Sequence, residues 1–156
     1  MSIKWLSKEK CFRLLKKEKY GRLATSDLNG QPYIVPLNFV LLENKIYFHG
    51  GFKGRKLENL RSNARVCFEV SRIGKLQAAP QAKNFSYRFW SVLVEGSARE
   101  IKNAELKLAV LNAIMKKYAA DYHFTPLSLS DMVDVNVVEM AVEKLSGKVS
   151  LAPTSS

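Results

Sequence analysis

Cysteine and histidine are scarce in this chain, which has 156 residues and only two of each. Cys11 and Cys67 lie far apart without a CxxC spacing, so the sequence shows neither a disulfide framework nor a zinc cluster. His49 and His123 alone are too few to build a dedicated metal site. We therefore expect no bound metal and a reducing environment.

Long apolar runs are also missing. No stretch approaches the roughly 20 consecutive apolar residues that a membrane-spanning helix needs, and no apolar core follows the first positive charges. These absences predict a cytoplasmic protein without membrane association.

Familiar catalytic signatures are absent as well. The sequence contains no GxSxG, no HExxH and no pair of carboxylates in a recognisable setting. Hydrolysis by protein side chains is therefore disfavoured, and no catalytic acid or base is nominated. If the protein is an enzyme, we expect a cofactor to carry the reaction.

Acidic residues are outnumbered, with 14 Asp and Glu against 25 Lys and Arg and a formal net charge of +11. Such an excess favours contact with anions, and a nucleic acid, an acidic membrane surface, a phosphorylated small molecule or plain solvation of a basic surface would each account for it. The sequence has no RNP-like aromatic signature, so nucleic acid ranks below a small molecule as the partner.

The composition that remains is that of a globular domain, since 47% of the residues are hydrophobic and 25% are charged. We expect a single domain over residues 1–156, with a core over 8–149 and a tail over 150–156. Helical spacing is expected at residues 8–19, 54–61 and 103–119. Short β-rich runs are expected at residues 21–26, 31–42, 45–49, 65–71, 90–100 and 135–145.

These elements predict an α+β fold, mainly β, in which six antiparallel strands form a barrel with flanking helices. Asn29 and Gly30 are expected to form a hairpin turn, and Gly21 to end the first helix. Pro36 cannot donate to a β-ladder, so its strand should bend, bulge or lie at an edge. Residues 73–89 fit neither period and are expected to form an irregular connection that is functional or mobile.

The most informative stretch, His49-Gly50-Gly51-Phe52-Lys53-Gly54-Arg55-Lys56, leaves a strand and enters a helix. Glycines expose backbone N–H groups, and a helix start with two cationic side chains favours a phosphate. A flexible turn followed by solvated basic residues explains the stretch equally well. Neither GxGxxG nor GxxxxGK[ST] is present, so ATP and the usual Rossmann dinucleotides are not indicated. His49 either reaches a ligand or bonds to a backbone carbonyl.

Seven segments taken in order resemble the FMN-binding split-barrel proteins related to pyridoxamine 5'-phosphate oxidase, in the branch that includes nitroimidazole-resistance proteins. The segments are GRLAT (21–25), GQPYIVPLNFV (30–40), IYFHG (46–50), GRKL (54–57), RVCFEV (65–70), SVLVEGSA (91–98) and LSGK (145–148). Each piece is weak alone, whereas the ordered set is specific and covers approximately residues 8–149.

The resemblance implies a Greek-key split barrel that forms a homodimer with FMN in clefts between the subunits. It further implies an oxidoreductase that moves a hydride or electrons from a donor such as NADH or NADPH to a small acceptor. The cofactor-binding positions that it implies are Val35, Pro36, Leu37, Asn38, Phe39, Phe48, His49, Gly50, Arg55, Lys56 and Ser91. Arg55 and Lys56 match the pair that holds the phosphate, residues 35–40 match the strand beside the flavin ring, and Ser91 matches a polar position near that ring.

Two departures from the family pattern narrow the expectation. Val35 stands where true pyridoxamine phosphate oxidases have arginine, and their C-terminal Trp and Arg signature is not evident after Val135. Oxidation of vitamin B6 is therefore not expected. His49 matches a histidine of the nitroimidazole-resistance branch, so reduction of a nitro compound remains one of the activities that the resemblance allows. Haem or a deazaflavin in the same barrel, and a non-catalytic nucleic-acid-binding barrel, are the alternatives.

Overall fold

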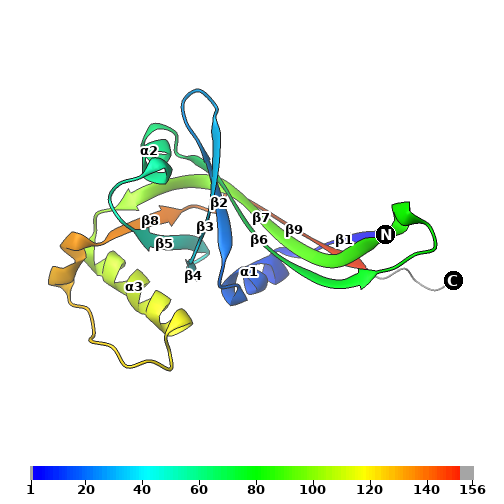
Figure 1. Ribbon diagram of the computed structural model, residues 1–156. Helices are drawn as coiled ribbons and strands as arrows, with labels where there is room; N and C mark the ends of the chain where they lie inside the picture. Colours follow the sequence, from blue (N-terminus) through cyan, green and yellow to red (C-terminus); the bar gives the residue numbers. More distant parts are fainter. Residues whose placement is uncertain (1, 152–156) are drawn as a thin grey trace.

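The computed structural model describes residues 2–151, which form a nine-stranded antiparallel sheet with helices around it (Figure 1). The strands are β1 (Ser2–Trp5), β2 (Gly21–Ser26), β3 (Pro32–Leu37), β4 (Val40–Leu42), β5 (Lys45–Gly50), β6 (Arg65–Gln77), β7 (Ser86–Ile101), β8 (Asn136–Met140) and β9 (Lys144–Leu151). The helices are α1 (Lys8–Lys17), α2 (Arg55–Ser62) and α3 (Ala104–Tyr118), with 3₁₀ turns η1 (Ala82–Asn84) and η2 (Leu129–Asp134).

The strands follow the order β3-β2-β6-β7-β8-β5-β4, and β9 also pairs with β7 and carries β1 on its other edge. The path is open between β3 and β4, so the sheet curls without closing. The predicted class, a mainly antiparallel β fold of the split-barrel kind with flanking helices, is confirmed. The predicted number of strands is corrected from six to nine.

Two predicted strands are each divided in the structure, for different reasons. The run over residues 31–42 breaks after Leu37, because the backbone of Phe39 bonds to side chains of α3 in place of a strand. The run over 135–145 becomes β8 and β9, which pair with successive stretches of β7. The chain between them passes so close to Gly96 that a Cβ there would lie 1.8 Å from the Ala141 oxygen. Strand β1 was not predicted.

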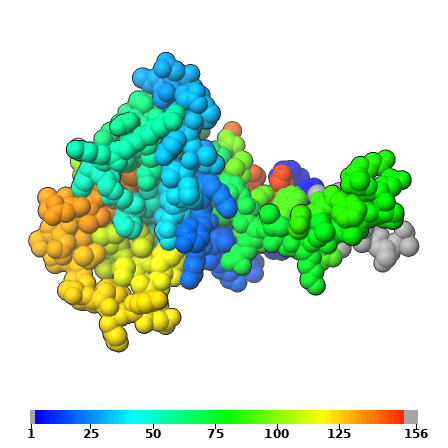
Figure 2. All heavy atoms as spheres, in the orientation of Figure 1, coloured from blue at the N-terminus to red at the C-terminus, as the bar shows by residue number. Residues whose placement is uncertain are grey.

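The prediction of an irregular connection over residues 73–89 is wrong. Strands β6 and β7 continue through this region as a hairpin arm that projects from the body of the molecule (Figures 1 and 2). The register shifts between Ile73 and Leu76, and the side chains from Arg72 to Leu76 are all exposed. The arm therefore lacks the inward and outward alternation by which a strand is recognised in a sequence.

Local signals were mostly sound. Ser7 and Asn103 cap α1 and α3, accepting the N–H groups of Lys10 and Leu106 at 3.3 and 2.7 Å. Pro36 lies in β3 at the edge of the sheet, and an edge position was one of the three predicted for it. Gly21 does not end a helix.

Gly21 instead lies in β2 under the Phe68 ring, where a Cβ would be 1.9 Å from the nearest ring atom. In the turn after β2, Gly30 alone has a positive φ, of 78°, and the Asp27 carboxylate accepts the N–H groups of Asn29 and Gln31. The predicted turn is therefore present, with the side chain of Asp27 closing it.

Two apolar clusters hold the fold together. The larger cluster is the core inside the curled sheet and includes Leu23, Phe39, Phe48 and Phe68. The smaller cluster lies between α3 and strands β5 and β8. Among residues 2–151, no helix has the length and apolar content to cross a membrane. Of the predicted tail, Ser150 and Leu151 belong to β9, and residues 152–156 lie outside the described residues.

Candidate anion and cofactor site

The glycine stretch forms the connection between the end of β5 and the start of α2. Gly54 is the N-cap residue of α2, with φ 115° and no side-chain cap. Its carbonyl accepts the N–H groups of Leu57 and Glu58 at 2.9 and 3.1 Å. The N–H groups of Arg55 and Lys56 have no hydrogen-bond partner within residues 2–151. The start of this helix is thus open to an anion.

The two basic side chains beside this helix start lie against aromatic rings. The Arg55 guanidinium lies 4.8 Å from the centre of the Tyr33 ring, and the Lys56 ammonium lies 5.0 Å from that of Phe48. Neither cation forms an ion pair within the part of the chain that the structure describes. Burial lowers the pKa of Lys56, because desolvation penalises its charge. A partly desolvated ammonium without a carboxylate is costly, and a phosphate would relieve that cost.

The remaining neighbours of the Lys56 ammonium also suit an anion. A Cβ on Gly50 would stand 3.7 Å from Lys56 Nζ, whereas one on Gly51 or Gly54 would meet nothing within 4 Å. The pKa of the partly exposed His49 is lowered by burial and then by the charge of Lys56. Donors and open space here fit a phosphate group.

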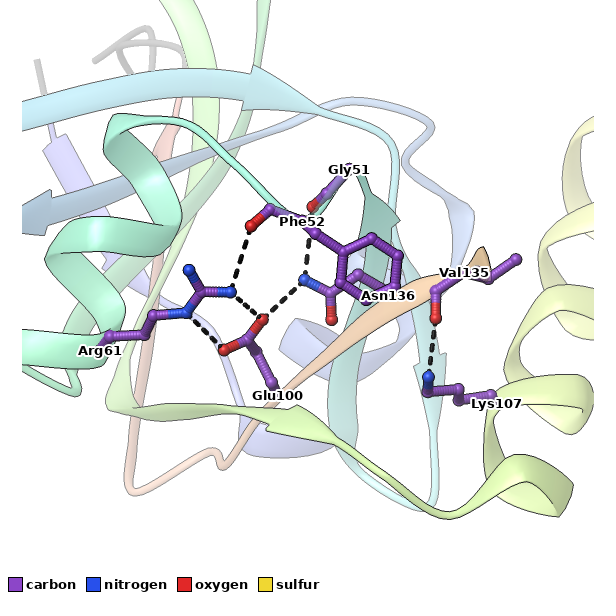
Figure 3. Close-up of polar contacts among 7 residues, drawn as sticks. All are labelled: Gly51, Phe52, Arg61, Glu100, Lys107, Val135 and Asn136. Atoms are coloured by element: carbon purple, nitrogen blue, oxygen red, sulfur yellow. Dashed lines mark hydrogen bonds and ion pairs between the residues drawn. The ribbon is translucent and has the colours of Figure 1, made fainter. Parts of the chain in front are cut away.

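The backbone of the glycine stretch is held by two side chains of other elements, and a third side chain joins these two (Figure 3). Arg61 of α2 donates to the Phe52 oxygen at 3.2 Å, and Asn136 of β8 donates to the Gly51 oxygen at 3.3 Å. Glu100 of β7 accepts from both of them. Sequence analysis missed Arg61, Glu100 and Asn136, since nothing in their spacing reveals that three distant elements meet at one loop.

A pocket of about 410 Å³ lies beside this corner and is lined by Leu37, Asn38, His49, Ile114 and Tyr118. The structure thus brings the predicted ring-side residues Leu37 and Asn38 together with His49. The ring of His49 has no hydrogen-bond partner within residues 2–151, so the interpretation of it as a histidine bonded to a carbonyl is not what the structure has.

Two predicted residues, Phe39 and Phe48, have buried side chains. Their side chains are 0% and 1% exposed and belong to the core. Phe39 packs edge-on against Phe68 at 4.8 Å between ring centres. Next to them, Val35 is partly buried and Pro36 exposed in β3, the strand that ends at Leu37.

Ser91 is the predicted residue that the chain does not bring to this corner. It lines a separate pocket of about 240 Å³ together with Trp5, Glu69, Leu93 and residues 146–148. This second pocket lies on the outer face of the sheet. His123, by contrast, is exposed in the segment after α3, as expected of a loop residue.

The structure is thus an open antiparallel split barrel with a cationic glycine corner. A sequence profile of the pyridoxamine 5'-phosphate oxidase family matches residues 7–149, and the chain belongs to that family. A search of curated proteins found no significant match.

Solved structures agree with this assignment. A candidate 5-nitroimidazole antibiotic resistance protein from Bacteroides thetaiotaomicron has 29% identity and a TM-score of 0.79, with 96% of this chain and 89% of that chain covered. An FAD-binding protein from Mesorhizobium loti has 27% identity and a TM-score of 0.72, with 97% and 100% covered. An FAD- and haem-binding protein from Mycobacterium smegmatis shares the fold at 18% identity, with a TM-score of 0.84 and 97% and 76% covered.

Proposed function

We propose that this chain is a flavin mononucleotide-binding oxidoreductase. The observation that carries the proposal is the uncompensated cationic corner of Arg55 and Lys56 at an open helix start, next to a pocket lined by His49 and the end of β3. A phosphate at the corner would leave the rest of a flavin near that pocket. The FAD-binding relative from Mesorhizobium loti and the family itself support a flavin as the guest.

In this proposal the chain binds and orients the cofactor. Arg55 and Lys56 hold the phosphate with charge-assisted hydrogen bonds, and the backbone of residues 37–39 lies beside the ring. His49, whose lowered pKa favours the neutral imidazole, offers one donor and one acceptor at the pocket. The bound flavin supplies the redox chemistry, passing a hydride or electrons from NADH or NADPH to a small acceptor. The candidate resistance protein from Bacteroides supports a nitroimidazole-like acceptor.

A homodimer is the second part of the proposal. The strand pairings place Ile34, Ser91, Leu93 and Trp5 on one outward face of the sheet. Ile34 is 65% exposed and Trp5 is 69% exposed. Exposed apolar side chains gathered on one face are typical of a protein–protein interface. A second copy docked there would cover these side chains. Ser91 would then meet a flavin only across the interface.

The test is an absorbance spectrum of the freshly purified protein, followed by mass spectrometry of whatever heat releases. The proposal expects oxidised flavin bands and the mass of FMN. A Soret band indicates haem, and the mass of FAD or of a deazaflavin indicates a different cofactor in the same barrel. A colourless protein that fails to bind added FMN contradicts flavin binding, and binding of nucleic acid by that protein would favour the non-catalytic alternative. We propose a cytoplasmic location to match this chemistry.

A further inference from the structure

Two consecutive peptide oxygens of the glycine stretch point into the protein, and this orients the N–H groups that follow them. The Gly51 oxygen accepts from Asn136 and the Phe52 oxygen accepts from Arg61. In a trans peptide the C=O and the next N–H point in opposite directions. The N–H groups of Phe52 and Lys53 are therefore directed away from this network, in a stretch whose residues 49–55 are all exposed.

One carboxylate fixes both of the donors that hold these oxygens. Glu100 accepts from Arg61 Nε and Nη2 at 2.8 Å each, and from Asn136 Nδ2 at 2.8 Å (Figure 3). The protons balance: Asn136 Nδ2 has one for Glu100 and one for the Gly51 oxygen, and Arg61 Nη2 has one for Glu100 and one for the Phe52 oxygen. Glu100→Gln therefore removes the charge that both donors share and puts an NH₂ group, which cannot accept, in place of one of the two carboxylate oxygens.

Burial and charge show that this network is held firmly. Asn136 is 3% exposed, so its amide cannot exchange its partners for water without cost. The bonds from Arg61 and Asn136 hold the pKa of Glu100 below its usual value against the opposing effect of burial. Arg61 lies in the last turn of α2, the helix whose first residues are Arg55 and Lys56. The network thus joins the last turn of the helix to the loop before its first turn.

We propose that Glu100 is a positioning residue for the phosphate site: through Arg61 and Asn136 it keeps the backbone N–H groups of the glycine stretch aimed at the phosphate of the cofactor. Glu100 does not touch the ligand, and the inference rests on the proposed function. Because the effect passes through the phosphate alone, it must separate FMN from riboflavin, which has the same ring and no phosphate. A residue with only a general structural role would affect both ligands equally.

The test compares the dissociation constants of FMN and riboflavin for the wild type and for Glu100→Gln, which keeps the size of the side chain. The proposal expects FMN to bind about tenfold more weakly or worse, and riboflavin to bind within about twofold of the wild type. Glu143→Gln is the matched control, because it also breaks an Arg–Glu pair, with Arg65, away from the glycine stretch. It should leave both constants unchanged.

Arg61→Lys provides a second variant should Glu100→Gln fail to fold, since lysine keeps the charge but cannot bridge Glu100 and the Phe52 oxygen together. It should also weaken FMN selectively. Equal weakening of both ligands, or no weakening of either, overturns the inference.

A wild type that binds neither flavin rejects the proposed function instead. In that case amide NMR of the wild type and Glu100→Gln titrated with inorganic phosphate still tests the inference. It expects shifts at Phe52, Lys53, Arg55 and Lys56 in the wild type only, and equal shifts in the two proteins contradict it.

Discussion

The Tyr118 hydroxyl, at the end of α3, lies within hydrogen-bond distance of both backbone polar atoms of Phe39. It accepts the Phe39 N–H at 2.9 Å, and its own proton has two acceptors, the oxygens of Phe39 at 2.7 Å and Lys19 at 2.8 Å. Lys117 donates to the Phe39 oxygen as well, at 2.9 Å. The last turn of α3 therefore takes the place of a neighbouring strand where β3 gives way to β4, beside the candidate flavin pocket.

Tyr118→Phe should lower the free energy of unfolding by about 1–3 kcal/mol, because it leaves the Phe39 N–H without its partner. Urea unfolding followed by circular dichroism measures this. Tyr122→Phe is the control, since Tyr122 is 73% exposed and should tolerate the change. Identical urea midpoints for the wild type and Tyr118→Phe would show that the hydroxyl does not hold the segment.

Glu139 should make the protein sensitive to acid. Burial alone would raise the pKa of this carboxyl, but bonds from Tyr47, Lys45 and Arg99 hold it below the ordinary 4.5. Since the pKa is lower in the folded state, the stabilisation is complete above about 4.5 and is lost as the pH falls through the folded value. Glu139→Gln should therefore cost stability at pH 7, and the cost should shrink below pH 4.5. A difference in unfolding free energy that stays constant from neutral to acid pH contradicts this account.

Leu93→Lys should convert the proposed dimer into a monomer and reduce flavin retention, because an ammonium on the outward face would be desolvated at the interface. Analytical ultracentrifugation with excess FMN measures both, through sedimentation and flavin absorbance. Val133→Lys, at a 76% exposed position of η2, is the control and should remain dimeric. The dimer proposal fails if the wild type sediments as a monomer while fully loaded with flavin.

Gly54→Ala should weaken FMN binding and destabilise the protein by about 1–3 kcal/mol, because its φ of 115° lies in a region that residues with a Cβ avoid. Gly51→Ala is a matched control for stability within the same stretch, since its φ is not positive and a Cβ there would meet no other protein atom within 4 Å. Titration with FMN and thermal unfolding of both variants give the comparison. Equal behaviour of the two alanine variants would remove any special role for the conformation of Gly54.

The sequence predicted elements wherever a periodic face or a cap was present. The capping residues Ser7 and Asn103 indicated where α1 and α3 begin. The β-rich runs that became β2 and the first half of β6 alternate between buried and less buried residues in the structure. The sequence could not reveal the arm, whose side chains are exposed without alternation, or the break at Phe39, which depends on Tyr118 far along the chain. Gly96 gave no sign that another segment passes directly over it.

The candidate site likewise has one part that the sequence could predict and one part that it could not. The corner at Gly54, Arg55 and Lys56 is contiguous in sequence, so an anion site could be proposed there from the sequence alone, beside the equal alternative of a flexible turn with solvated basic residues. Glu100 and Asn136 reach this corner only because β7 and β8 pair there, and no local pattern encodes that meeting. The structure also separates Ser91 from the corner, which a resemblance between aligned segments does not show.

The most direct measurement is a fluorescence titration of FMN and riboflavin with the wild type and with the double variant Arg55→Ala, Lys56→Ala. Two charge-assisted contacts to the phosphate should make the wild type prefer FMN over riboflavin by about 100-fold or more. The double variant should lose most of this preference and still bind riboflavin as the wild type does. FMN binding that is unchanged in the double variant would contradict the cationic corner as the phosphate site.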